Sequence, residues 1–338
     1  MATIPYRASA TGARPPALAE YKMLFMRIAH LSDPHINLKY HPQHLPRLRR
    51  TLEDALRRGA EHIVITGDLT SNADARDLRT TRRLFEMLGI MRSSKLTIVP
   101  GNHDIYGGPQ LADDVLAFPE RCRICDTRER LAIFQEHFSE LFADTITVGG
   151  LAYPFVKRLK HVAFMALNTV AEHSVIGNPF GSNGEIVKGH RQSIDHLGNF
   201  HAWRTARYRI VLMHHHLFRH RDLVRMGRQA SSGLASTIEL QTLKLHRKRR
   251  ALGMFERIGA NLLLHGHVHF TGQYDRNGLI CLNSAGAVSP TNREDGFAYH
   301  LIDLGVRAPS ISRVTVSKLK RESIIESPQD NARVIATV

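Results

Sequence analysis

The sequence predicts a layered α/β domain in which helices cover a core of β-strands. From residue 26 onwards, apolar strand-like runs alternate with segments of amphipathic helical periodicity, which is typical of this fold class. Several of these runs end in short polar segments that contain glycine. Ligands in open α/β sheets bind beyond the carboxyl ends of the strands, so the same pattern also indicates where a functional site would lie.

The first part of the domain contains three strands and two helices in alternation. Leu48, Leu52 and Leu56 recur at helical spacing and predict a helix over residues 45–58. The expected elements, in order, are a strand at 27–31, the helix at 45–58, a strand at 63–65, a helix at 77–88 and a strand at 96–99.

The alternation of strands and helices is interrupted over residues 106–127, a stretch with Gly, Pro and two cysteines for which no regular element is expected. It then resumes. The expected elements are a helix at 131–142, a strand at 162–167, a Gly/Asn-rich loop at 177–184, a helix at 186–197, a strand at 208–213, a helix ending over 252–258 and a strand at 260–264. Beyond residue 270 short strands alternate with turns, and Asn277-Gly278 predicts a hairpin.

We expect one domain over residues 26–320, preceded by a disordered extension (1–25) and followed by a weakly ordered tail (321–338). No run approaches the roughly eighteen apolar residues of a membrane-spanning helix. The extension lacks the apolar block of a signal peptide. Three cysteines in 338 residues argue against a disulfide framework and favour the cytoplasm.

The chain is strongly basic, with 46 Lys and Arg against 31 Asp and Glu, a formal net charge of +15. Such an excess favours polyanionic partners: nucleic acid, an anionic lipid surface or a phosphorylated small molecule. Much of it lies in an insertion around residues 217–250, where Arg219 and Arg221 are candidate substrate-binding residues. This insertion is a candidate for peripheral association with the inner face of a membrane. The alternative is a solvated basic face without a partner.

Polar side chains that bind metals gather at the predicted strand ends. They combine carboxylates, an amide and imidazoles, a mixed oxygen and nitrogen set that suits Mn, Fe, Zn or Ni better than Ca or Mg. One tetrahedral ion needs four ligands, so a larger set indicates two ions that share a carboxylate. The residues are Asp33, His35, Asp68, Asn102, His103, His214, His267 and His269.

The order of these groups resembles that of the calcineurin-like metallophosphoesterase family, in particular its bacterial phosphodiesterases and pyrophosphatases. The motifs are Asp33-x-His35, Gly67-Asp68, Gly101-Asn102-His103-Asp104, His214-His215 and Gly266-His267-x-His269. The resemblance implies a four-layered α/β/β/α sandwich, in which two mixed β-sheets pack face to face with helices outside. It also implies that residues 26–320 form a metallophosphoesterase domain.

Carried over residue by residue, the resemblance implies a role for each motif residue. Asp33, His35 and His269 would hold one divalent ion, Asn102, His214 and His267 a second, and Asp68 would bridge them. His103 would contact the phosphate and protonate the leaving group, and Asp104 would orient His103. The implied reaction is hydrolysis of a phosphodiester or pyrophosphate bond by attack of a metal-bridging hydroxide, as metal ions at such sites permit.

Other histidines and cysteines have competing interpretations. His215 is either a contact to the substrate or to a ligand, or an ordinary surface residue. His265 and His30 lie in strand-like runs and are expected to be core residues. The Cys122/Cys125 pair has no second pair to complete a zinc site, so we expect a structural or incidental role.

Four functional alternatives remain. Ser32-Asp33-Pro34-His35 is similar to the first motif of bacterial cyclic-nucleotide phosphodiesterases and of the UDP-2,3-diacylglucosamine pyrophosphatases of lipid A synthesis. The latter would act on a nucleotide-lipid substrate. A non-catalytic scaffold is disfavoured because every ligand is present. A nucleic-acid-binding protein is disfavoured because aromatic residues are only 7% of the chain and no helix-turn-helix or zinc-finger pattern occurs.

Overall fold

A computed structural model describes residues 25–218, 245–284, 286–288, 296–306 and 308–317 of the chain. Arg219, Arg221 and most of the basic insertion lie outside the described residues. So do most of the N-terminal extension and most of the C-terminal tail. The predictions made for those segments, and the domain boundaries, stay predictions.

The first β-sheet carries the N-terminal motifs. It has five strands in the described residues, in the order β12 (Ser310–Ser317), β11 (Gly296–Leu304), β1 (Met26–Leu31), β2 (His62–Thr66) and β3 (Leu96–Val99). Strands β1, β2 and β3 are parallel, whereas β11 runs antiparallel to both β1 and β12. The three parallel strands therefore end at the same edge of the sheet.

The second β-sheet carries the C-terminal motifs. Its seven strands in the described residues are β4 (Ile146–Thr147), β5 (Phe155–Leu159), β6 (Val162–Ala166), β7 (Tyr208–Leu212), β8 (Leu262–His265), β10 (Leu279–Asn283) and β9 (Gly272–Arg276), in spatial order. Strands β6, β7, β8 and β10 are parallel. The hairpin predicted at Asn277-Gly278 joins antiparallel β9 and β10, and both turn residues have positive φ (54° and 86°).

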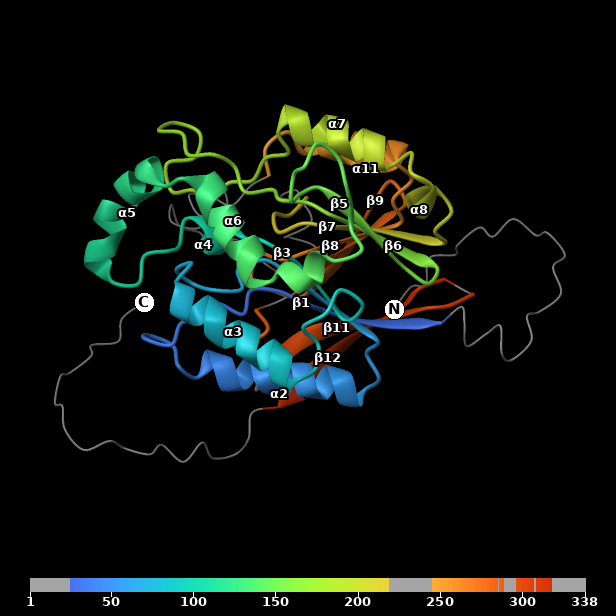
Figure 1. The fold of residues 1–338 in the computed structure, drawn as a ribbon, viewed down its shortest axis with the longest axis horizontal. Coiled ribbons are helices and arrows are strands. Elements are labelled where there is room, and N and C mark those ends of the chain that lie inside the picture. The colour runs from blue at the N-terminus through green and yellow to red at the C-terminus, as the bar shows by residue number, and fades with distance from the viewer. Residues whose placement is uncertain (1–24, 219–244, 285, 289–295, 307, 318–338) are drawn as a thin grey trace, which may run out of the picture.

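Helices cover the outer face of each sheet, so the predicted four-layered α/β/β/α sandwich is confirmed (Figure 1). Helices α2 (His44–Arg57), α3 (Ala75–Met87) and α6 (Thr127–His137) pack on the first sheet. Helices α7 (Lys188–Leu197), α8 (His201–Arg204) and α11 (Lys248–Arg257) pack on the second. The described chain also contains α4 (Asn102–Ile105), α5 (Ala112–Ile124) and the 3₁₀ helix η1 (Ser139–Phe142).

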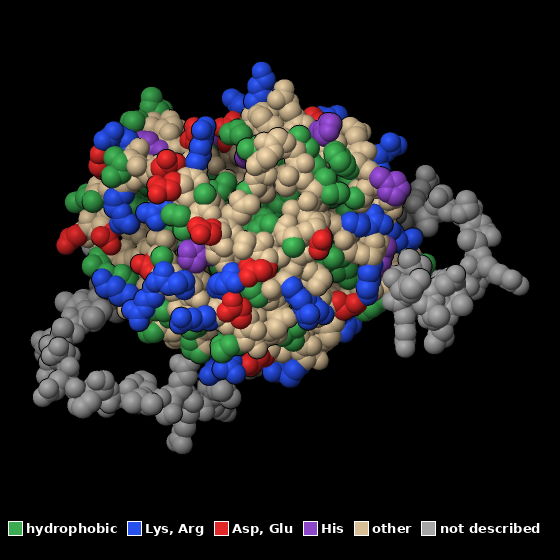
Figure 2. Space-filling model, viewed as in Figure 1, with side chains coloured by type: hydrophobic (Ala, Val, Ile, Leu, Met, Phe, Trp, Pro, Cys, Tyr) green, Lys and Arg blue, Asp and Glu red, His purple; other side chains and the backbone are tan. Residues whose placement is uncertain are grey.

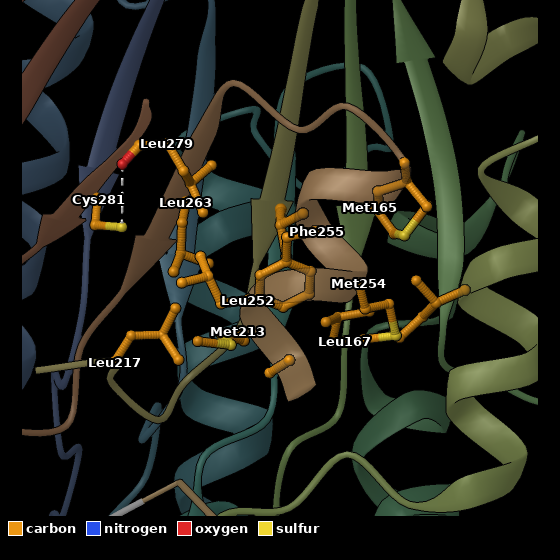
Figure 3. Close-up of a cluster of buried hydrophobic side chains, with 14 of the residues drawn as sticks. Met165, Leu167, Met213, Leu217, Leu252, Met254, Phe255, Leu263, Leu279 and Cys281 are labelled. Atoms are coloured by element: carbon orange, nitrogen blue, oxygen red, sulfur yellow. Dashed lines mark hydrogen bonds between the residues drawn. The ribbon is translucent and has the colours of Figure 1, made fainter. Parts of the chain in front are cut away.

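Alternation along the central strands builds three apolar layers. In β2, Val64 packs between the two sheets, while Ile63 and Ile65 pack against the helices of the first sheet. In β8, Leu264 packs between the sheets and Leu263 packs under the helices of the second sheet. Figure 3 shows that helix-side layer. Strands buried on both faces read as continuous apolar runs, which is why the sequence revealed them clearly.

The structure corrects two expectations about helices. Residues 106–127, expected to be irregular, contain α5 with Pro119 inside it. The carboxylate of Asp114 accepts the N–H groups of Gln110 and Leu111 (3.1 and 3.2 Å) and so stabilises the start of this helix. The helix expected at 131–142 is divided into α6, capped by Asp126, and the separate turn η1.

Strand β5 was not expected from the sequence because it contains Lys157 and Arg158, yet Lys157 is fully buried. Its Nζ donates to the carbonyl oxygens of Leu141 (2.7 Å), Ser93 (3.2 Å) and Leu96 (3.3 Å) and to the hydroxyl of Thr97 (3.2 Å). This ammonium group ties the edge of the second sheet to β3 of the first. Burial lowers the pKa of Lys157 to about 7, although Asp144 opposes the shift.

We expect Lys157→Met to weaken the rise of stability with pH in alkaline solution. Between about pH 7 and pH 10.5 the unfolded chain holds a proton on Lys157 that the folded chain releases, so the free energy of unfolding rises with pH. One proton corresponds to a slope of about 1.4 kcal/mol per pH unit at most. Urea unfolding from pH 7 to 10 measures it. The exposed Lys188, changed to Met as a control, should leave the slope unchanged; an unaltered slope in the Lys157 variant would contradict the assignment.

Candidate metal centre

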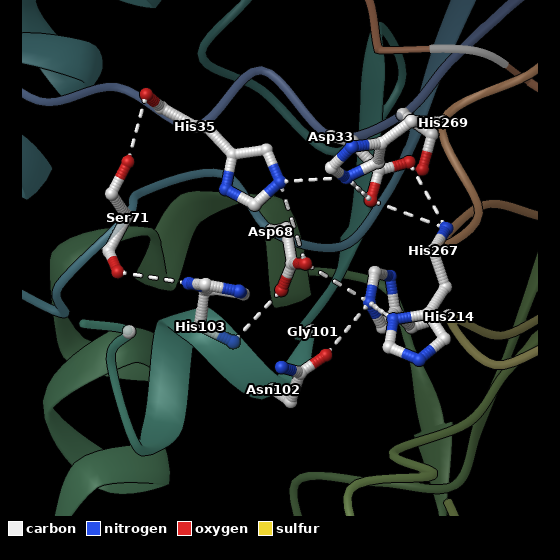
Figure 4. Close-up of polar contacts among 12 residues, drawn as sticks. Asp33, His35, Asp68, Ser71, Gly101, Asn102, His103, His214, His267 and His269 are labelled. Atoms are coloured by element: carbon white, nitrogen blue, oxygen red, sulfur yellow. Dashed lines mark hydrogen bonds and ion pairs between the residues drawn. The ribbon is translucent and has the colours of Figure 1, made fainter. Parts of the chain in front are cut away.

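The predicted ligands lie together where the parallel strands of both sheets end (Figure 4). From the first sheet, Asp33 and His35 follow β1, Asp68 follows β2, and Asn102 begins α4 just after β3. From the second sheet, His214 follows β7, and His267 and His269 follow β8. The centre therefore lies at one edge of the sandwich and draws side chains from both sheets.

One group of ligand atoms comes from Asp33, His35, Asp68 and His269, all within 4.8 Å of one another. The Nε2 atoms of His35 and His269 are 3.0 Å apart. His35 Nε2 lies 3.6 Å from Asp68 Oδ2, and His269 Nε2 lies 3.6 Å from Asp33 Oδ1. His269 is the exposed member of the group, which leaves this side of the centre open to solvent.

A second group comes from Asp68, His214 and His267, again within 4.8 Å. The Nε2 atom of His214 lies 3.2 Å from Asp68 Oδ2, 3.1 Å from Asn102 Oδ1 and 2.9 Å from His267 Nδ1. These side chains are buried. Asp68 belongs to both groups, the position of a carboxylate that bridges two sites.

The chemistry of these atoms fits a cation. His214 Nδ1 lies 2.8 Å from the carbonyl oxygen of Thr66 and must donate to it, so Nε2 of a neutral His214 carries a lone pair. That lone pair faces carboxylate and amide oxygens that can only accept, an arrangement that needs a proton or a metal ion among them. Burial alone lowers the pKa of His214, but Asp68 and Asp33 raise it to about 9. The centre thus attracts positive charge strongly.

The backbone at the ligands is held in unusual conformations. Asp33, His35, Asp68, His267 and His269 all have positive φ, between 44° and 78°. Non-glycine residues in this region are strained by about 1–3 kcal/mol each and cluster at functional sites. Hydrogen bonds between the motif loops maintain them, for example from Asp33 N to Gly67 O (3.1 Å) and from His267 N to Asp33 Oδ1 (3.1 Å).

The motif glycines permit close approach of the loops. A Cβ atom on Gly266 would lie 1.7 Å from Ser32 Oγ and 2.5 Å from Asp33 Oδ2. A Cβ atom on Gly67, where φ is +92°, would lie 2.3 Å from His214 Nδ1. These positions therefore accept only glycine while the ligands keep their places.

We expect Gly266→Ala to destabilise the fold by about 1–3 kcal/mol and to weaken metal binding, because Asp33 must move away from the new methyl group. Denaturant unfolding and metal titration measure both effects. Gly253→Ala is the matched control: it lies in helix α11 with nothing within 4 Å of the added carbon. That change should stabilise by about 0.5–1 kcal/mol. Equal effects of the two substitutions would contradict the steric explanation.

His103 lies beside the ligands on the first turn of α4. Its backbone N–H donates to Asp68 Oδ1 (2.8 Å), and its ring packs edge-on against His35 at 4.7 Å between centroids. Ring atom Nδ1 donates to the carbonyl oxygen of Ser71 (3.0 Å). Because Nδ1 is engaged in this way, Nε2 is the atom with which His103 can exchange a proton with another group.

The structure corrects the expected role of Asp104 as the partner that orients His103. Among the described residues, Ser71 holds the ring instead, and the Asp104 carboxylate turns to the backbone of neighbouring loops. It accepts hydrogen bonds from Thr70 N (2.8 Å), Gly101 N (2.9 Å), Leu69 N (3.1 Å) and Thr70 Oγ1 (3.2 Å). Burial and the charge of Asp68 raise the pKa of Asp104 to about 6. Asp104 therefore fixes the loops that carry Asp68 and Asn102.

The remaining histidines are placed clearly. His215 is fully buried, with Nδ1 2.8 Å from Thr169 Oγ1 and its ring 4.6 Å from that of His267, so the surface alternative is wrong. His265 and His30 are core residues, as expected. His265 bonds the Tyr274 hydroxyl (2.7 Å), and His30 bonds the Thr66 hydroxyl (2.9 Å).

Cys122 is buried and Cys125 half-buried in the cluster beneath α5, and both are free thiols.

Two kinds of contributor to the centre were missed from the sequence, a pair of backbone carbonyl groups and a glycine. The carbonyl groups of Thr66 and Ser71 orient His214 and His103, and a backbone carbonyl has no residue type that would reveal it. Gly108 is the other: a Cβ atom there would lie 2.2 Å from Cε1 of His103. The Gly107-Gly108 pair that follows the third motif is a pattern from which this close approach could have been inferred.

A four-layered sandwich with carboxylate and imidazole ligands at its edge defines a class of metal-dependent hydrolases. The sequence model of the calcineurin-like phosphoesterases matches residues 26–270. The chain belongs to this family and is accordingly a metallophosphoesterase, an enzyme of the hydrolase class. No curated protein matches the chain.

Solved structures are similar to this chain at low sequence identity. A purple acid phosphatase from yellow lupin seeds is 10% identical with a TM-score of 0.51, and the match covers 86% of this chain and 51% of the lupin chain. A dimetal phosphatase from Danio rerio is 13% identical with a TM-score of 0.48, covering 85% of this chain and 98% of that one. The first of these supports the fold alone.

Proposed function

We propose that the chain is a binuclear metal-dependent phosphohydrolase that cleaves a phosphodiester or pyrophosphate bond. The observation that carries this proposal is the pair of ligand groups that share Asp68. A shared carboxylate between two sets of nitrogen and oxygen donors is the arrangement expected for two adjacent divalent ions. Asp33, His35 and His269 would hold one ion, and Asn102, His214 and His267 the other.

Mn, Fe, Zn or Ni would suit this donor set. When bound, such ions supply positive charge for the phosphoryl oxygens and make water a nucleophile at neutral pH. Residues of the chain itself hold the ligands in position and exclude water. Thr66 and Asp104 keep the ligand loops in place, because they bond His214 and the backbone beside Asp68. The buried side chains of the second group exclude water from one side of the centre.

His103 would bind the substrate phosphate and donate a proton from Nε2 to the departing oxygen. Ser71 holds the ring in one orientation through Nδ1, so that Nε2 alone is available for this transfer. General acids placed in this way contribute about 10²–10⁴-fold to rate. His215 is buried and would hold the His267 ring in position through the contact between the two rings.

The substrate is proposed to be a phosphorylated small molecule or a nucleotide-linked lipid, with UDP-2,3-diacylglucosamine and cyclic nucleotides as the specific alternatives. Substrate binding by Arg219 and Arg221 and peripheral membrane association through the basic insertion remain part of the proposal. Among the described helices, none combines the length and apolar composition that crossing a bilayer requires.

A substrate panel tests the proposal. After metal removal, each of the four metals is added back with a bis-aryl phosphodiester, an aryl phosphomonoester, cyclic AMP or a UDP-linked diacyl sugar, and bound metal is counted by elemental analysis. We expect two ions per chain and faster cleavage of the diester, cyclic or diphosphate compounds than of the monoester. A single ion per chain, or preference for the monoester, would overturn the proposal.

A further inference from the structure

The loop after β2 brings Ser71 into contact with two histidines of the metal centre, as Figure 4 shows. The Ser71 hydroxyl donates to the carbonyl oxygen of His35 (3.1 Å), and the Ser71 carbonyl oxygen accepts from Nδ1 of His103 (3.0 Å). A carbonyl oxygen can accept two hydrogen bonds, and it holds a ring only as firmly as its own loop is held. The groups that fix this carbonyl therefore determine the orientation of His103.

The side-chain amide of Asn72 lies against the same carbonyl group. Its Nδ2 atom donates to Ser71 O (2.9 Å) and to Gly108 O (2.9 Å). This orientation follows from the neighbouring groups, because the reverse one would turn the amide oxygen toward both carbonyl oxygens. The reverse orientation would gain in return only a long bond from Gly108 N (3.4 Å). Asn72 thus joins two backbone segments that both contact the His103 ring.

Gly108 makes the second of these contacts. A Cβ atom there would lie 2.2 Å from Cε1 and 2.5 Å from Nδ1 of His103, so the backbone of residue 108 packs directly on the ring. Gln110 adds a bond from Nε2 to Gly108 O (3.3 Å), and its Oε1 accepts from Asn37 Nδ2 (2.9 Å). Side-chain amides therefore connect the loops that follow β1, β2 and α4.

The side chains that make these connections are uncharged. Lys, Arg, Asp and Glu side chains are mixed over the face of the molecule that Figure 2 shows. Asn37, Asn72 and Gln110 instead join the loops by hydrogen bonds between neutral groups. An amide can donate to a carbonyl oxygen without adding charge to the site. Orientation of the ring is therefore the contribution that these bonds can make.

We propose that Asn72 is a positioning residue for His103. This inference rests on the proposed phosphohydrolase function, in which His103 transfers a proton through Nε2. Asn72 keeps the Ser71 carbonyl in place as the acceptor for Nδ1–H, and it holds Gly108 against the ring. With Nδ1 engaged and rotation of the ring limited, Nε2 stays the atom that can exchange a proton.

Kinetics of Asn72→Asp test the proposal with almost no change in side-chain size. A carboxylate can only accept, so it cannot bond the two carbonyl oxygens. We expect kcat on an alkyl diester to fall by up to about 10²-fold, kcat on a nitrophenyl diester to fall less, and bound metal to stay unchanged. Asn199→Asp is the matched control and should keep both activities, because Asn199 Nδ2 donates to a backbone carbonyl, that of Asp195 (3.0 Å), on the surface.

Two further variants separate orientation from charge. Asn72→Ala adds no charge and should give the same pattern of losses. It also decides the matter if Asn72→Asp does not fold. Combined with His103→Ala, either Asn72 substitution should lower kcat no further, because the group that Asn72 orients is then absent.

NMR of the His103 ring tests the proposal without turnover. In protein with isotope-labelled histidine and diamagnetic zinc, the His103 signal is the one that His103→Ala removes. In weakly alkaline solution we expect the Nδ1–H tautomer in the wild type and in Asn199→Asp. Both Asn72 variants should show a mixture of the two tautomers, because the Ser71 carbonyl is no longer held.

The outcomes separate this proposal from the proposed function. A wild type that cleaves no compound of the panel would overturn the function, and the tautomers would still report whether Asn72 orients the ring. Wild-type kcat on both diesters, or an unchanged tautomer in the Asn72 variants, would overturn the positioning role. So would equal losses on the two diesters with loss of metal, since Asn72 would then support the whole centre.

Discussion

Asp68→Ala is expected to remove turnover almost completely, by roughly a thousandfold or more, and to lower bound metal below the wild-type amount. Asp68 is the one carboxylate present in both ligand groups of the described residues, and its Oδ1 also accepts the backbone N–H of His103. Loss of a single group that stabilises transition-state charge costs about 10²–10³ in rate, and Asp68 affects both metal groups and the position of His103.

Elemental analysis and kcat measured on the same preparation check this expectation. Asp195→Ala is the matched control, because the Asp195 side chain forms a surface ion pair with Arg257 (3.0 Å), and such pairs contribute little. It should keep both metal and activity. Wild-type turnover in the Asp68 variant would exclude a bridging role.

The second large effect is expected for His103→Ala, which should lower kcat by about 10²–10⁴ while the amount of bound metal stays that of the wild type. The substitution should change kcat without changing metal binding, because the only side-chain hydrogen bond of His103 among the described residues is to Ser71. The backbone N–H of residue 103, which alanine retains, donates to Asp68. The loss should be largest for substrates with a poorly acidic leaving group, since these depend most on proton donation.

His201→Ala, an exposed histidine on α8, is the control and should leave kcat unchanged. Activities toward a nitrophenyl and an alkyl diester give the comparison of leaving groups. If the His103 variant lost metal, or lost activity equally on both substrates, the residue would act in positioning the centre rather than in proton transfer.

The sequence predicted the central strands well, and it placed the candidate ligands at strand ends that the structure brings together, for one physical reason. Parallel strands buried on both faces are continuous apolar runs, as at β2 and β8, and polar residues that interrupt them must lie at strand ends. The ends of β1, β2, β3, β7 and β8 then share an edge of the sandwich, so residues far apart in sequence come together there.

What the sequence did not show depends on contacts rather than composition. Strand β5 was hidden because Lys157 is stabilised in the interior by carbonyl groups from other elements. The role of Asp104 was misassigned because its partners are backbone N–H groups, such as that of Thr70, which every sequence contains. His215 was left open between surface and site because its burial depends on loop 169–184, where Gly184 packs against its ring.

The division of the candidate ligands between the two sheets would make metal supply a determinant of folding. Asp33 and Asp68 come from the first sheet and His214 and His267 from the second, so an ion held among them fastens one layer of the sandwich to the other. By mass action, a ligand that binds only the folded chain adds about 2.7 kcal/mol to the free energy of unfolding at a hundredfold excess over its Kd. Scarcity of the ion would lower the free energy of unfolding as well as the rate of turnover.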